Sequence, residues 1–306
     1  MAQMDVRELL ARWELQPDKG LGQNFLVDQK MLERVVEAAA LTDEDVVLEI
    51  GAGPGNLTHR LACQAGHVIA VELDGRFIPV LQSVLAGITN VTLVHGDILA
   101  LDPAALVRRS PTARGETHPH YKVVANLPYY ITSAVLRHLL EASLRPASIV
   151  VTVQREVAQR IVAGPGEMSL LAVSVQLYGQ PRLLFRIRPG SFYPPPEVES
   201  AVVRIVPHTV PPVQVDDTRA FFRIVRAGFS QRRKQLRNAL AAGLGLSPEE
   251  VALRLQETGI DPRRRAQSLT LQEWAVVARA LGGGSATPRS VLALGGGGEG
   301  AATLDE

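Results

Sequence analysis

The segment Asn126-Leu127-Pro128-Tyr129-Tyr130 follows an apolar run and carries side chains that can hold an amine-bearing base. An asparagine oxygen and the carbonyl of the residue before a proline place two hydrogen-bond acceptors in a rigid frame. Acceptors that bond both hydrogens of an exocyclic amine favour the positive charge that develops as the amine attacks an electrophile. The Tyr129 ring can stack on the base. We interpret Asn126, Leu127, Pro128 and Tyr129 as catalytic; the alternative is a strand-ending turn with a partly buried tyrosine pair.

A second stretch, over residues 46–57, reads V-V-L-E-I-G-A-G-P-G-N-L. A short apolar run that ends in glycines predicts a buried parallel strand and a tight turn. Glycine permits positive φ angles and close approach of a ligand, so we expect Gly51 and Gly53 to line a cofactor. Asn56 is expected to cap the following helix. The G-x-G-x-G spacing differs from the dinucleotide fingerprint, and the turn alone indicates only an adenosine-containing cofactor such as NAD or S-adenosylmethionine (SAM).

Two acidic residues follow the next two predicted strands. Glu72 ends an apolar run about 20 residues after the glycine turn, where an acid can accept hydrogen bonds from ribose hydroxyls. Asp97 lies just beyond the run 91–94, where it can bond an adenine amino group or, alternatively, cap the next helix. Because ligands of open α/β sheets bind beyond the carboxyl ends of the strands, both acids are expected to face one crevice.

The alternation of strand and helix patterns predicts an α/β fold with a mostly parallel sheet covered on both faces. Two closing strands, expected over 183–187 and 201–206, look antiparallel and favour a Rossmann-like class I SAM-dependent methyltransferase domain, which we place at 1–206. A small all-helical C-terminal domain is predicted over 207–283, and the Gly-rich residues 284–306 are expected to be a disordered tail. The second domain's helices are expected over 218–229, 234–242, 247–258 and 271–281.

The composition excludes several classes of protein. The chain of 306 residues is 46% hydrophobic with a formal net charge of +1, so it carries no global basic field. Its single cysteine, Cys63, cannot form an intramolecular disulfide and is expected to be buried. The histidines show no metal-ligand spacing, and no apolar run has the length of a membrane span. We expect a cytoplasmic, monomeric protein with no membrane partner and no metal ion.

Further motifs extend the pattern over nearly the whole chain. Together they make the chain similar to the KsgA/RsmA type of ribosomal RNA small-subunit adenine dimethyltransferase. The resemblance rests on G-Q-N-F-L at 22–26, E-I-G-A-G-P-G-N-L-T at 49–58, E-L-D at 72–74, G-D at 96–97, N-L-P-Y-Y at 126–130, S-F-Y-P-P-P-E-V-E-S-A-V-V at 191–203 and F-S-Q-R-R-K-Q-L-R-N-A-L at 229–240.

The resemblance implies an enzyme of ribosome biogenesis. It would use SAM to add two methyl groups to each of two adjacent adenosines in a hairpin loop near the 3′ end of small-subunit (16S) rRNA. The cofactor residues that it implies are Asn24, Leu26, Gly51, Glu72, Asp97 and Asn126. Among them, Gly51 would lie at the methionine end, Glu72 on the ribose and Asp97 on the adenine, with Asn126 at the reacting amine. Phe192 matches the family's loop aromatic and is expected to stack on the target base opposite Tyr129.

Basic residues gather in the predicted C-terminal domain. Seven of them lie between Arg219 and Arg237, with no acid in that stretch. Such a run is commonly a solvated helix face, but here it overlaps a family motif, and a basic face suits docking on a phosphate backbone. We therefore expect Arg232, Arg233, Lys234 and Arg237 to bind RNA. The implied partner is small-subunit rRNA in an immature 30S subunit.

Other interpretations stay open at this point. The catalytic segment would equally serve a related adenine-N6 methyltransferase acting on 23S rRNA or DNA. A non-catalytic ribosome assembly factor would keep the same fold. The basic cluster favours the small-subunit type, and intact Asn126, Glu72 and Asp97 favour catalysis. An NAD oxidoreductase is disfavoured because the glycine spacing is wrong and no residues for hydride chemistry appear.

Overall fold

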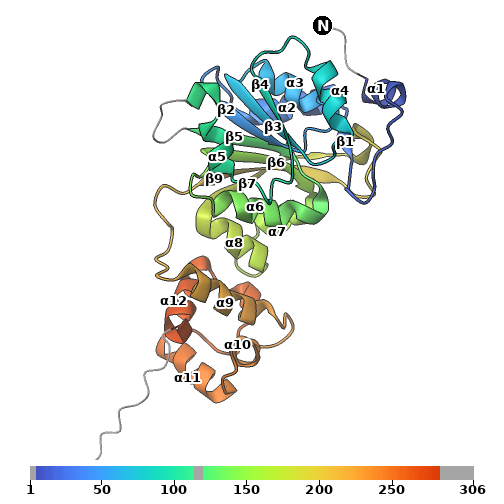
Figure 1. The fold of residues 1–306 in the computed structure, drawn as a ribbon. Coiled ribbons are helices and arrows are strands. Elements are labelled where there is room, and N and C mark those ends of the chain that lie inside the picture. The colour runs from blue at the N-terminus through green and yellow to red at the C-terminus, as the bar shows by residue number, and fades with distance from the viewer. Residues whose placement is uncertain (1–4, 114–119, 283–306) are drawn as a thin grey trace, which may run out of the picture.

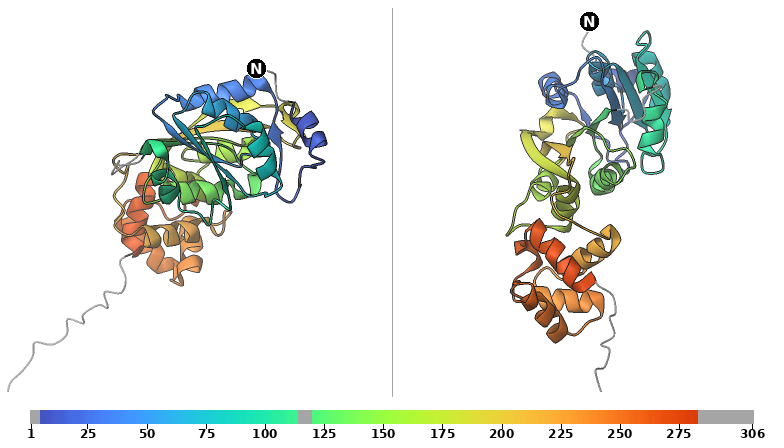
Figure 2. Two further views of the ribbon diagram at one scale, coloured as in Figure 1. Left: turned by 45° about the horizontal axis from the view of Figure 1, so that its top comes forward. Right: turned by 90° about the vertical axis from the view of Figure 1, so that its left-hand side faces the viewer.

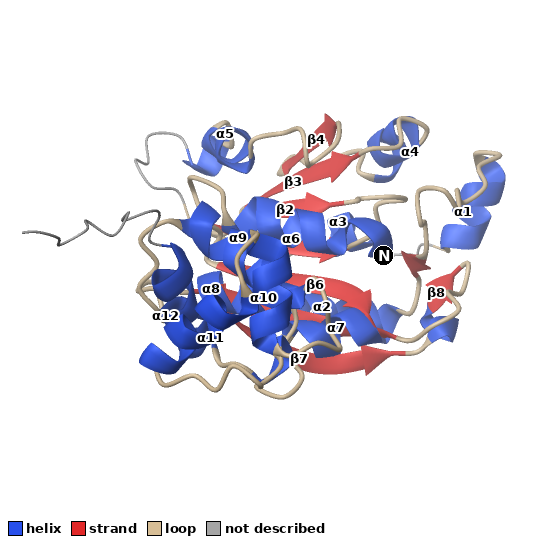
Figure 3. Cartoon of the chain, turned by 90° about the horizontal axis from the view of Figure 1, so that it is seen from below, coloured by secondary structure: helices blue, strands red, loops and turns tan. Residues whose placement is uncertain are grey.

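The computed structural model describes residues 5–113 and 120–282. Seven strands form one sheet in the order β4-β3-β2-β5-β6-β9-β7, a row that can be followed in Figure 3. Their bounds are β4 Val91–His95, β3 His67–Glu72, β2 Val46–Ile50, β5 Tyr121–Asn126, β6 Ser148–Gln154, β9 Ser200–Pro207 and β7 Gly179–Ile187. The strands from β4 to β6 are parallel, and β9 is antiparallel to both β6 and β7. The predicted α/β class and antiparallel closing pair are confirmed.

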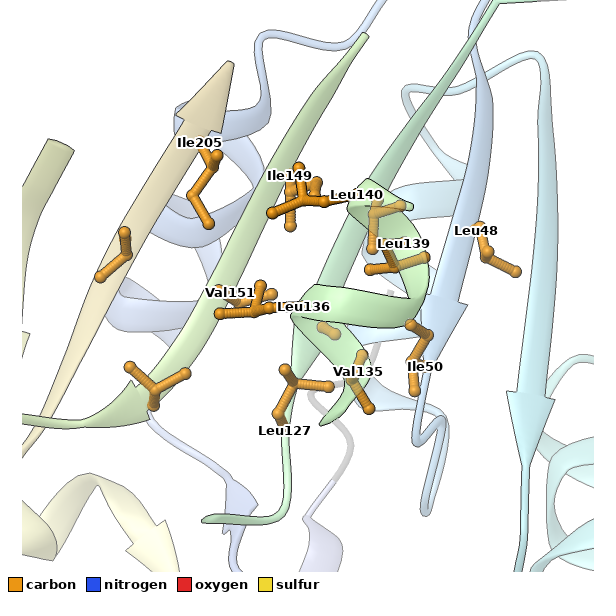
Figure 4. Packing of buried hydrophobic residues seen from close by; sticks show 14 of the residues in the cluster. Leu48, Ile50, Leu127, Val135, Leu136, Leu139, Leu140, Ile149, Val151 and Ile205 are labelled. Atoms are coloured by element: carbon orange, nitrogen blue, oxygen red, sulfur yellow. The ribbon is translucent and has the colours of Figure 1, made fainter. Parts of the chain in front are cut away.

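Helices cover both faces of the sheet because its strands alternate buried apolar side chains between the two sides. Val47 belongs to the core on one side and Leu48 to the core on the other. On the Val47 side lie α1 Val6–Arg12, α2 Gln29–Ala39, α3 Asn56–Ala62 and α4 Phe77–Val84. On the Leu48 side lie α5 Pro103–Arg108, α6 Thr132–Leu140, α7 Arg155–Ile161 and α8 Leu170–Tyr178. Figure 4 shows α6 laying Leu136, Leu139 and Leu140 on this second face.

The C-terminal part is helical, as predicted, and lies below the sheet in Figures 1 and 2. Its helices are α9 Thr218–Phe229, α10 Leu236–Leu244, α11 Pro248–Glu257 and α12 Leu271–Gly282. They surround the fully buried Trp274. Helix α8 joins this core as well, because Ala172, Val173 and Leu177 pack into it while Leu171 and Val175 pack against the sheet. The predicted tail over 284–306 lies outside the described residues.

Short elements connect these layers. A two-residue strand β1, Phe25–Leu26, pairs antiparallel with β8, Phe192–Tyr193. Four 3₁₀ turns complete the described structure: η1 Pro111–Ala113, η2 Tyr129–Ile131, η3 Pro189–Ser191 and η4 Ala266–Ser268.

Two local expectations were wrong. Asn56 is not the helix cap: Gly55, with a φ of 87°, precedes α3, and the Asn56 amide instead donates to the Leu26 carbonyl. The Asn56 side chain therefore bonds a residue 30 positions earlier in the chain and does not cap its own helix. Cys63 is exposed, because it lies at the C-terminal end of α3 and points away from the core.

In the described part of the chain, no helix has both the length and the hydrophobicity needed to cross a membrane. The same residues contain no group of three or more His, Cys, Asp or Glu side chains placed to hold a metal ion.

Candidate active site

One pocket lies beyond the carboxyl ends of β2, β3, β4 and β5. Including the open space at its mouth it encloses about 800 Å³. The loop before β1, the glycine turn, the ends of β3 and β4 and the segment after β5 all contribute to its walls. The predicted site residues among them are Asn24, Gly51, Gly53, Glu72, Asp97, Asn126, Leu127, Pro128 and Tyr129.

Two predicted site residues do not line this pocket. The β1–β8 ladder pairs Leu26 with Phe192 and buries both, leaving them 3% and 1% exposed. The Phe192 ring packs in the core on the Val47 side of the sheet, so it offers no free face to a base. In this conformation Phe192 is not placed to stack on a base, and its stacking role stays a prediction. The Leu26 carbonyl accepts the Asn56 amide, which ties β1 to the glycine turn.

The glycine turn brings bare backbone to the pocket floor. Gly51 and Gly53 have φ angles of 76° and 53°, in the left-handed region that side chains rarely adopt. A Cβ at Gly53 would lie 2.9 Å from the Phe25 ring, so the close packing of the turn needs a glycine there. A ligand can therefore approach this stretch of main chain without meeting a side chain.

Glu72 is held in place by the backbone. One carboxylate oxygen accepts the Gly53 N–H at 2.7 Å and the other accepts the Asp74 N–H at 2.8 Å. Burial raises the pKa of Glu72, and these two N–H groups act in the opposite direction. Each oxygen keeps a further lone pair, so the carboxylate can still accept a hydroxyl from a ligand.

Asp97 has a structural bond as well as a place in the pocket wall. Its Oδ1 accepts the Leu99 N–H at 2.9 Å and its backbone carbonyl accepts the Ala100 N–H, which together form the turn after β4. Asp97 does not cap the next helix, because Asp102 is the N-cap of α5; the bonds within the turn leave the side chain available for ligand contact. The side chain is exposed to the pocket mouth.

The segment after β5 is anchored on both sides. The Asn126 Nδ2 donates to the Asn24 carbonyl at 2.9 Å, and the Leu127 N–H donates to the Thr152 carbonyl at 3.2 Å. The Asn126 amide N–H is engaged, and none of the described residues donates to Oδ1, which is therefore available as an acceptor. Among the described residues, no loop N–H or side chain donates to the Leu127 carbonyl, so it is a second free acceptor.

The two tyrosines of this segment have different surroundings. The Tyr129 hydroxyl hydrogen-bonds the Ser200 hydroxyl at 2.7 Å, and burial raises the Tyr129 pKa. Tyr130 is 60% exposed, and its ring lies beside Gly22 at the mouth of the pocket. An exposed aromatic side chain there is not part of the core.

Some pocket residues carried too weak a signal to be predicted. Leu73 and Ile98 each come directly after a predicted acid and add apolar walls beside it. Gln23 belongs to a quoted motif, yet its role depends on a partner 51 residues away. Leu73 and Ile98 could have been predicted by including the residue that directly follows each acid at a strand end.

Below the turn, Glu49 on β2 is completely buried, and neither carboxylate oxygen has a hydrogen-bond partner among the described residues. Burial raises its pKa to about 8; the nearby Thr58 hydroxyl lowers it and the Glu72 carboxylate raises it further. A carboxyl with this pKa is mostly protonated at neutral pH. It does not face the pocket.

The sheet order, the glycine turn and the acids after β3 and β4 define a class I SAM-dependent methyltransferase. The chain belongs to the ribosomal RNA adenine dimethylase family, whose model matches residues 15–281. The resemblance inferred from the motifs is thereby confirmed.

Curated relatives cover nearly the same span. The chain is 49% identical over 270 residues to ribosomal RNA small subunit methyltransferase A of Dehalococcoides mccartyi strain CBDB1, covering 88% of this chain and 90% of the relative. It is 45% identical over 277 residues to the protein of that name from Pelotomaculum thermopropionicum, covering 89% and 94%.

Solved structures share the fold. The 23S rRNA methyltransferase ErmE aligns with a TM-score of 0.64 at 25% identity, covering 84% of this chain and 99% of ErmE. A dimethyladenosine transferase from Plasmodium falciparum aligns with a TM-score of 0.67 at 22% identity, covering 83% and 95%. The second likeness supports the fold alone.

Proposed function

We propose that the protein dimethylates N6 of two adjacent adenosines in the 3′-terminal hairpin loop of small-subunit rRNA, with SAM as methyl donor. Family membership makes it an rRNA adenine dimethyltransferase, and the relatives that carry the small-subunit name support that target. The observation that carries the chemistry is the Asn126 carboxamide, whose N–H is engaged by Asn24 and whose oxygen is free.

The reacting amine is met by two fixed acceptors. An adenine N6 amine is a weak nucleophile because its lone pair is delocalised into the ring. Asn126 Oδ1 and the Leu127 carbonyl would each accept one amine hydrogen, which favours the charge that develops during attack. No strong base is required, because the amine proton becomes acidic once the methyl group has been added.

The pocket residues fit SAM, which when bound supplies a methyl group activated by its positively charged sulfur. The bare main chain at Gly51 and Gly53 can approach the methionine part. In this proposal Glu72 binds the ribose and Asp97 binds the adenine, with Leu73 and Ile98 as apolar contacts beside them; all four line the pocket. A cation suits this wall, which presents carboxylates and carbonyl oxygens.

Aromatic rings at the pocket mouth can hold the base once it has left its stack. Tyr129 lies within the wall and Tyr130 is exposed at the rim. We propose that Tyr129 stacks on the target adenine and that Tyr130, in place of the buried Phe192, contacts a neighbouring base.

The helical part supplies a basic surface for the RNA. Arg232, Arg233 and Lys234 are exposed between α9 and α10, and none of them forms an ion pair within residues 5–113 and 120–282. Unpaired exposed cations are available for phosphates. Arg237 is half-buried at the start of α10 and would be a minor contact. In this proposal residues 207–283 dock the monomeric enzyme on an immature 30S subunit in the cytoplasm, while 1–206 carry out the transfer.

The test is methyl transfer from labelled SAM to small subunits that lack the modification, with large subunits and duplex DNA as parallel acceptors. We expect label at dimethyladenosine in small-subunit RNA. The methyl-transfer rate of the Asn126→Ala variant should be lower by about 100-fold or more. Losses of this size are typical when one preorganised group that stabilises a developing charge is removed. Label in large subunits or DNA would support the proposed methyl transfer but contradict small-subunit rRNA as the target. SAM binding without transfer to any acceptor would favour a non-catalytic assembly factor.

A further inference from the structure

Residues 18–24, which we call the strap, cross the mouth of the pocket between the end of β3 and the segment after β5. Leu21, Gly22, Gln23 and Asn24 of the strap all line the pocket. The strap is closed on itself by two main-chain bonds, from Gly22 N–H to the Lys19 carbonyl and from Gln23 N–H to the Asp18 carbonyl. It is therefore a shaped loop, and its position depends on what holds it at either side.

On the β3 side, the Gln23 side chain bridges two elements. Its Oε1 accepts the Asp18 N–H at 2.7 Å, and its Nε2 donates to Asp74 Oδ2 at 2.9 Å. Arg76 donates to both Asp74 oxygens and holds the pKa of that carboxyl at about 2. Asp74 is thus a fixed, ionised acceptor for the Gln23 amide.

On the other side, the strap contacts the catalytic segment. The Asn24 carbonyl accepts the Asn126 amide at 2.9 Å. At Gly22, which has a φ of 62°, an added Cβ would lie 3.4 Å from the Tyr130 ring and 3.6 Å from Pro128. The bond that orients the Asn126 carboxamide therefore comes from the strap itself.

The same chain of bonds reaches the cofactor wall. Asp74 donates its N–H to one oxygen of Glu72, and Gly53 donates its N–H to the other. One connected series of hydrogen bonds therefore runs from the glycine turn through Glu72, Asp74 and the strap to Asn126.

We propose that Gln23 and Asp74 are positioning residues: their hydrogen bond seats the strap so that the Asn24 carbonyl holds the Asn126 carboxamide with Oδ1 toward the substrate amine. The inference rests on the proposed function through the role of Asn126. It predicts that a substitution at Gln23 lowers the rate of methyl transfer by shifting Asn126, although Gln23 itself does not contact the reacting atoms.

The sharpest variant is Gln23→Glu. It places a second carboxylate against Asp74, and like charges at this distance repel. Because Arg76 keeps Asp74 ionised, a proton taken up at lower pH would go to the introduced carboxyl, which could then donate to Asp74 as the amide did. Glu72, Asp18, Lys19 and His95 are further charged or titratable groups near this site, and His95 lies against Gly75. The wild type and Gln64→Glu are measured at each pH as controls. Gln64→Glu makes the same change at an exposed position, so any pH effect common to all three proteins does not arise from the carboxylate at position 23.

The first readout uses the ligand-free protein. Hydrogen exchange of the peptide covering 18–26 should speed up at least about tenfold in Gln23→Glu at pH 8, relative to both controls, and return toward them at pH 6. Equal exchange at both pH values would overturn the idea that Gln23 seats the strap.

The second readout is single-turnover methyl transfer at saturating SAM. Gln23→Glu should lose about tenfold or more at pH 8 and recover at pH 6. The double variant Gln23→Glu/Asp74→Asn, which exchanges amide and carboxylate, should recover part of the rate at pH 8. A full rate for Gln23→Glu at pH 8 would refute the positioning role and leave the proposed function intact. Failure of the proposed function would instead appear as no transfer by the wild type.

Discussion

Hydrogen bonds that are already made decide what each pocket residue can still do. Asn126 has its N–H donated to Asn24, and both Glu72 oxygens accept backbone N–H groups. The groups left over are acceptors, which suits an amine and ribose hydroxyls. The chemistry of the site thus follows from partners that lie outside the reacting atoms.

Glu49 gives a pH-dependent prediction. Its pKa rises from a usual 4.5 to about 8 on folding, so folding favours the protonated form. That contribution to stability is fully present below about pH 4.5 and is lost as the pH rises through about 8. Glu49→Gln should be more stable to urea than the wild type at pH 9. Between pH 5 and 8 the difference should grow by up to about 1.4 kcal/mol per pH unit.

The control for this measurement is Glu44→Gln, at an exposed position, which should show no such trend. Identical urea midpoints for the wild type and Glu49→Gln at pH 9 would contradict burial of an ionisable carboxyl at position 49.

Tyr130 gives a prediction about substrate contact. Base–aromatic stacking contributes about 1–3 kcal/mol per base, so Tyr130→Ala should lower kcat/KM for RNA about tenfold. Tyr130→Phe keeps the ring and should stay near the wild type. The comparison uses steady-state kinetics with RNA as the varied substrate, and SAM affinity measured separately checks that the pocket is intact. A Tyr130→Ala enzyme with unchanged kcat/KM would show that the exposed ring contacts no base.

Two features of the secondary-structure elements could not be predicted from strand and helix patterns: the short β1–β8 ladder and the packing of helix α8 into two cores. The ladder of β1 with β8 buries Phe192, which was expected to stack on the target base. Helix α8 is apolar around most of its surface, and its two sides belong to two different cores. A helix that is buried on several sides joins the layers it touches.

Helix α9 packs closely on α12, which makes Gly228 a sensitive position. A Cβ there would lie 2.4 Å from the Trp274 ring, and both residues are buried. Gly228→Ala should destabilise the helical part by about 1–3 kcal/mol through overpacking. Urea unfolding followed by Trp fluorescence measures this, with Gly164→Ala as the control because its Cβ would meet nothing within 4 Å. An unchanged unfolding midpoint would mean that α9 and α12 pack less tightly than the structure shows.

For the whole molecule, the distribution of charge matters more than its sum. Although the formal net charge is only +1, the α9–α10 junction carries a group of exposed cations that form no ion pair with any described residue. That group lies in the helical part, which is below the sheet in Figure 1, whereas the pocket is lined by strand ends and loops of residues 21–131. The arrangement suits an enzyme whose docking surface and reacting atoms are separate.

Replacing Arg232 and Arg233 by Glu should weaken binding to small ribosomal subunits and reduce its salt dependence. The slope of log K against log salt should fall by roughly 0.7–0.9 for each phosphate that the variant no longer neutralises. The matched control is the same change at Arg108 and Arg109, an exposed pair at the end of α5. Titrations at several salt concentrations provide the measurement. Parallel slopes for the two double variants would remove the docking role from the α9–α10 junction.

The sequence by itself determined the parts of the protein that depend on neighbouring residues. Apolar runs located strands, and β2 begins at Val46, where the apolar run begins. Gly51 and Gly53 adopt the positive φ angles that only their residue type makes easy. Parallel strands then brought Glu72, Asp97 and Asn126 to one edge, since that edge collects the carboxyl ends of all four strands.

Only the tertiary structure decided the features that depend on partners far along the chain. Gln23 and Asp74 meet across 51 residues, and Asn24 and Asn126 across 102. Phe192 is buried where β1 pairs with β8, while the described residues leave Tyr130 60% exposed. Local patterns carry no information about such meetings, because a buried contact gains its energy from the partner and from the water that both exclude.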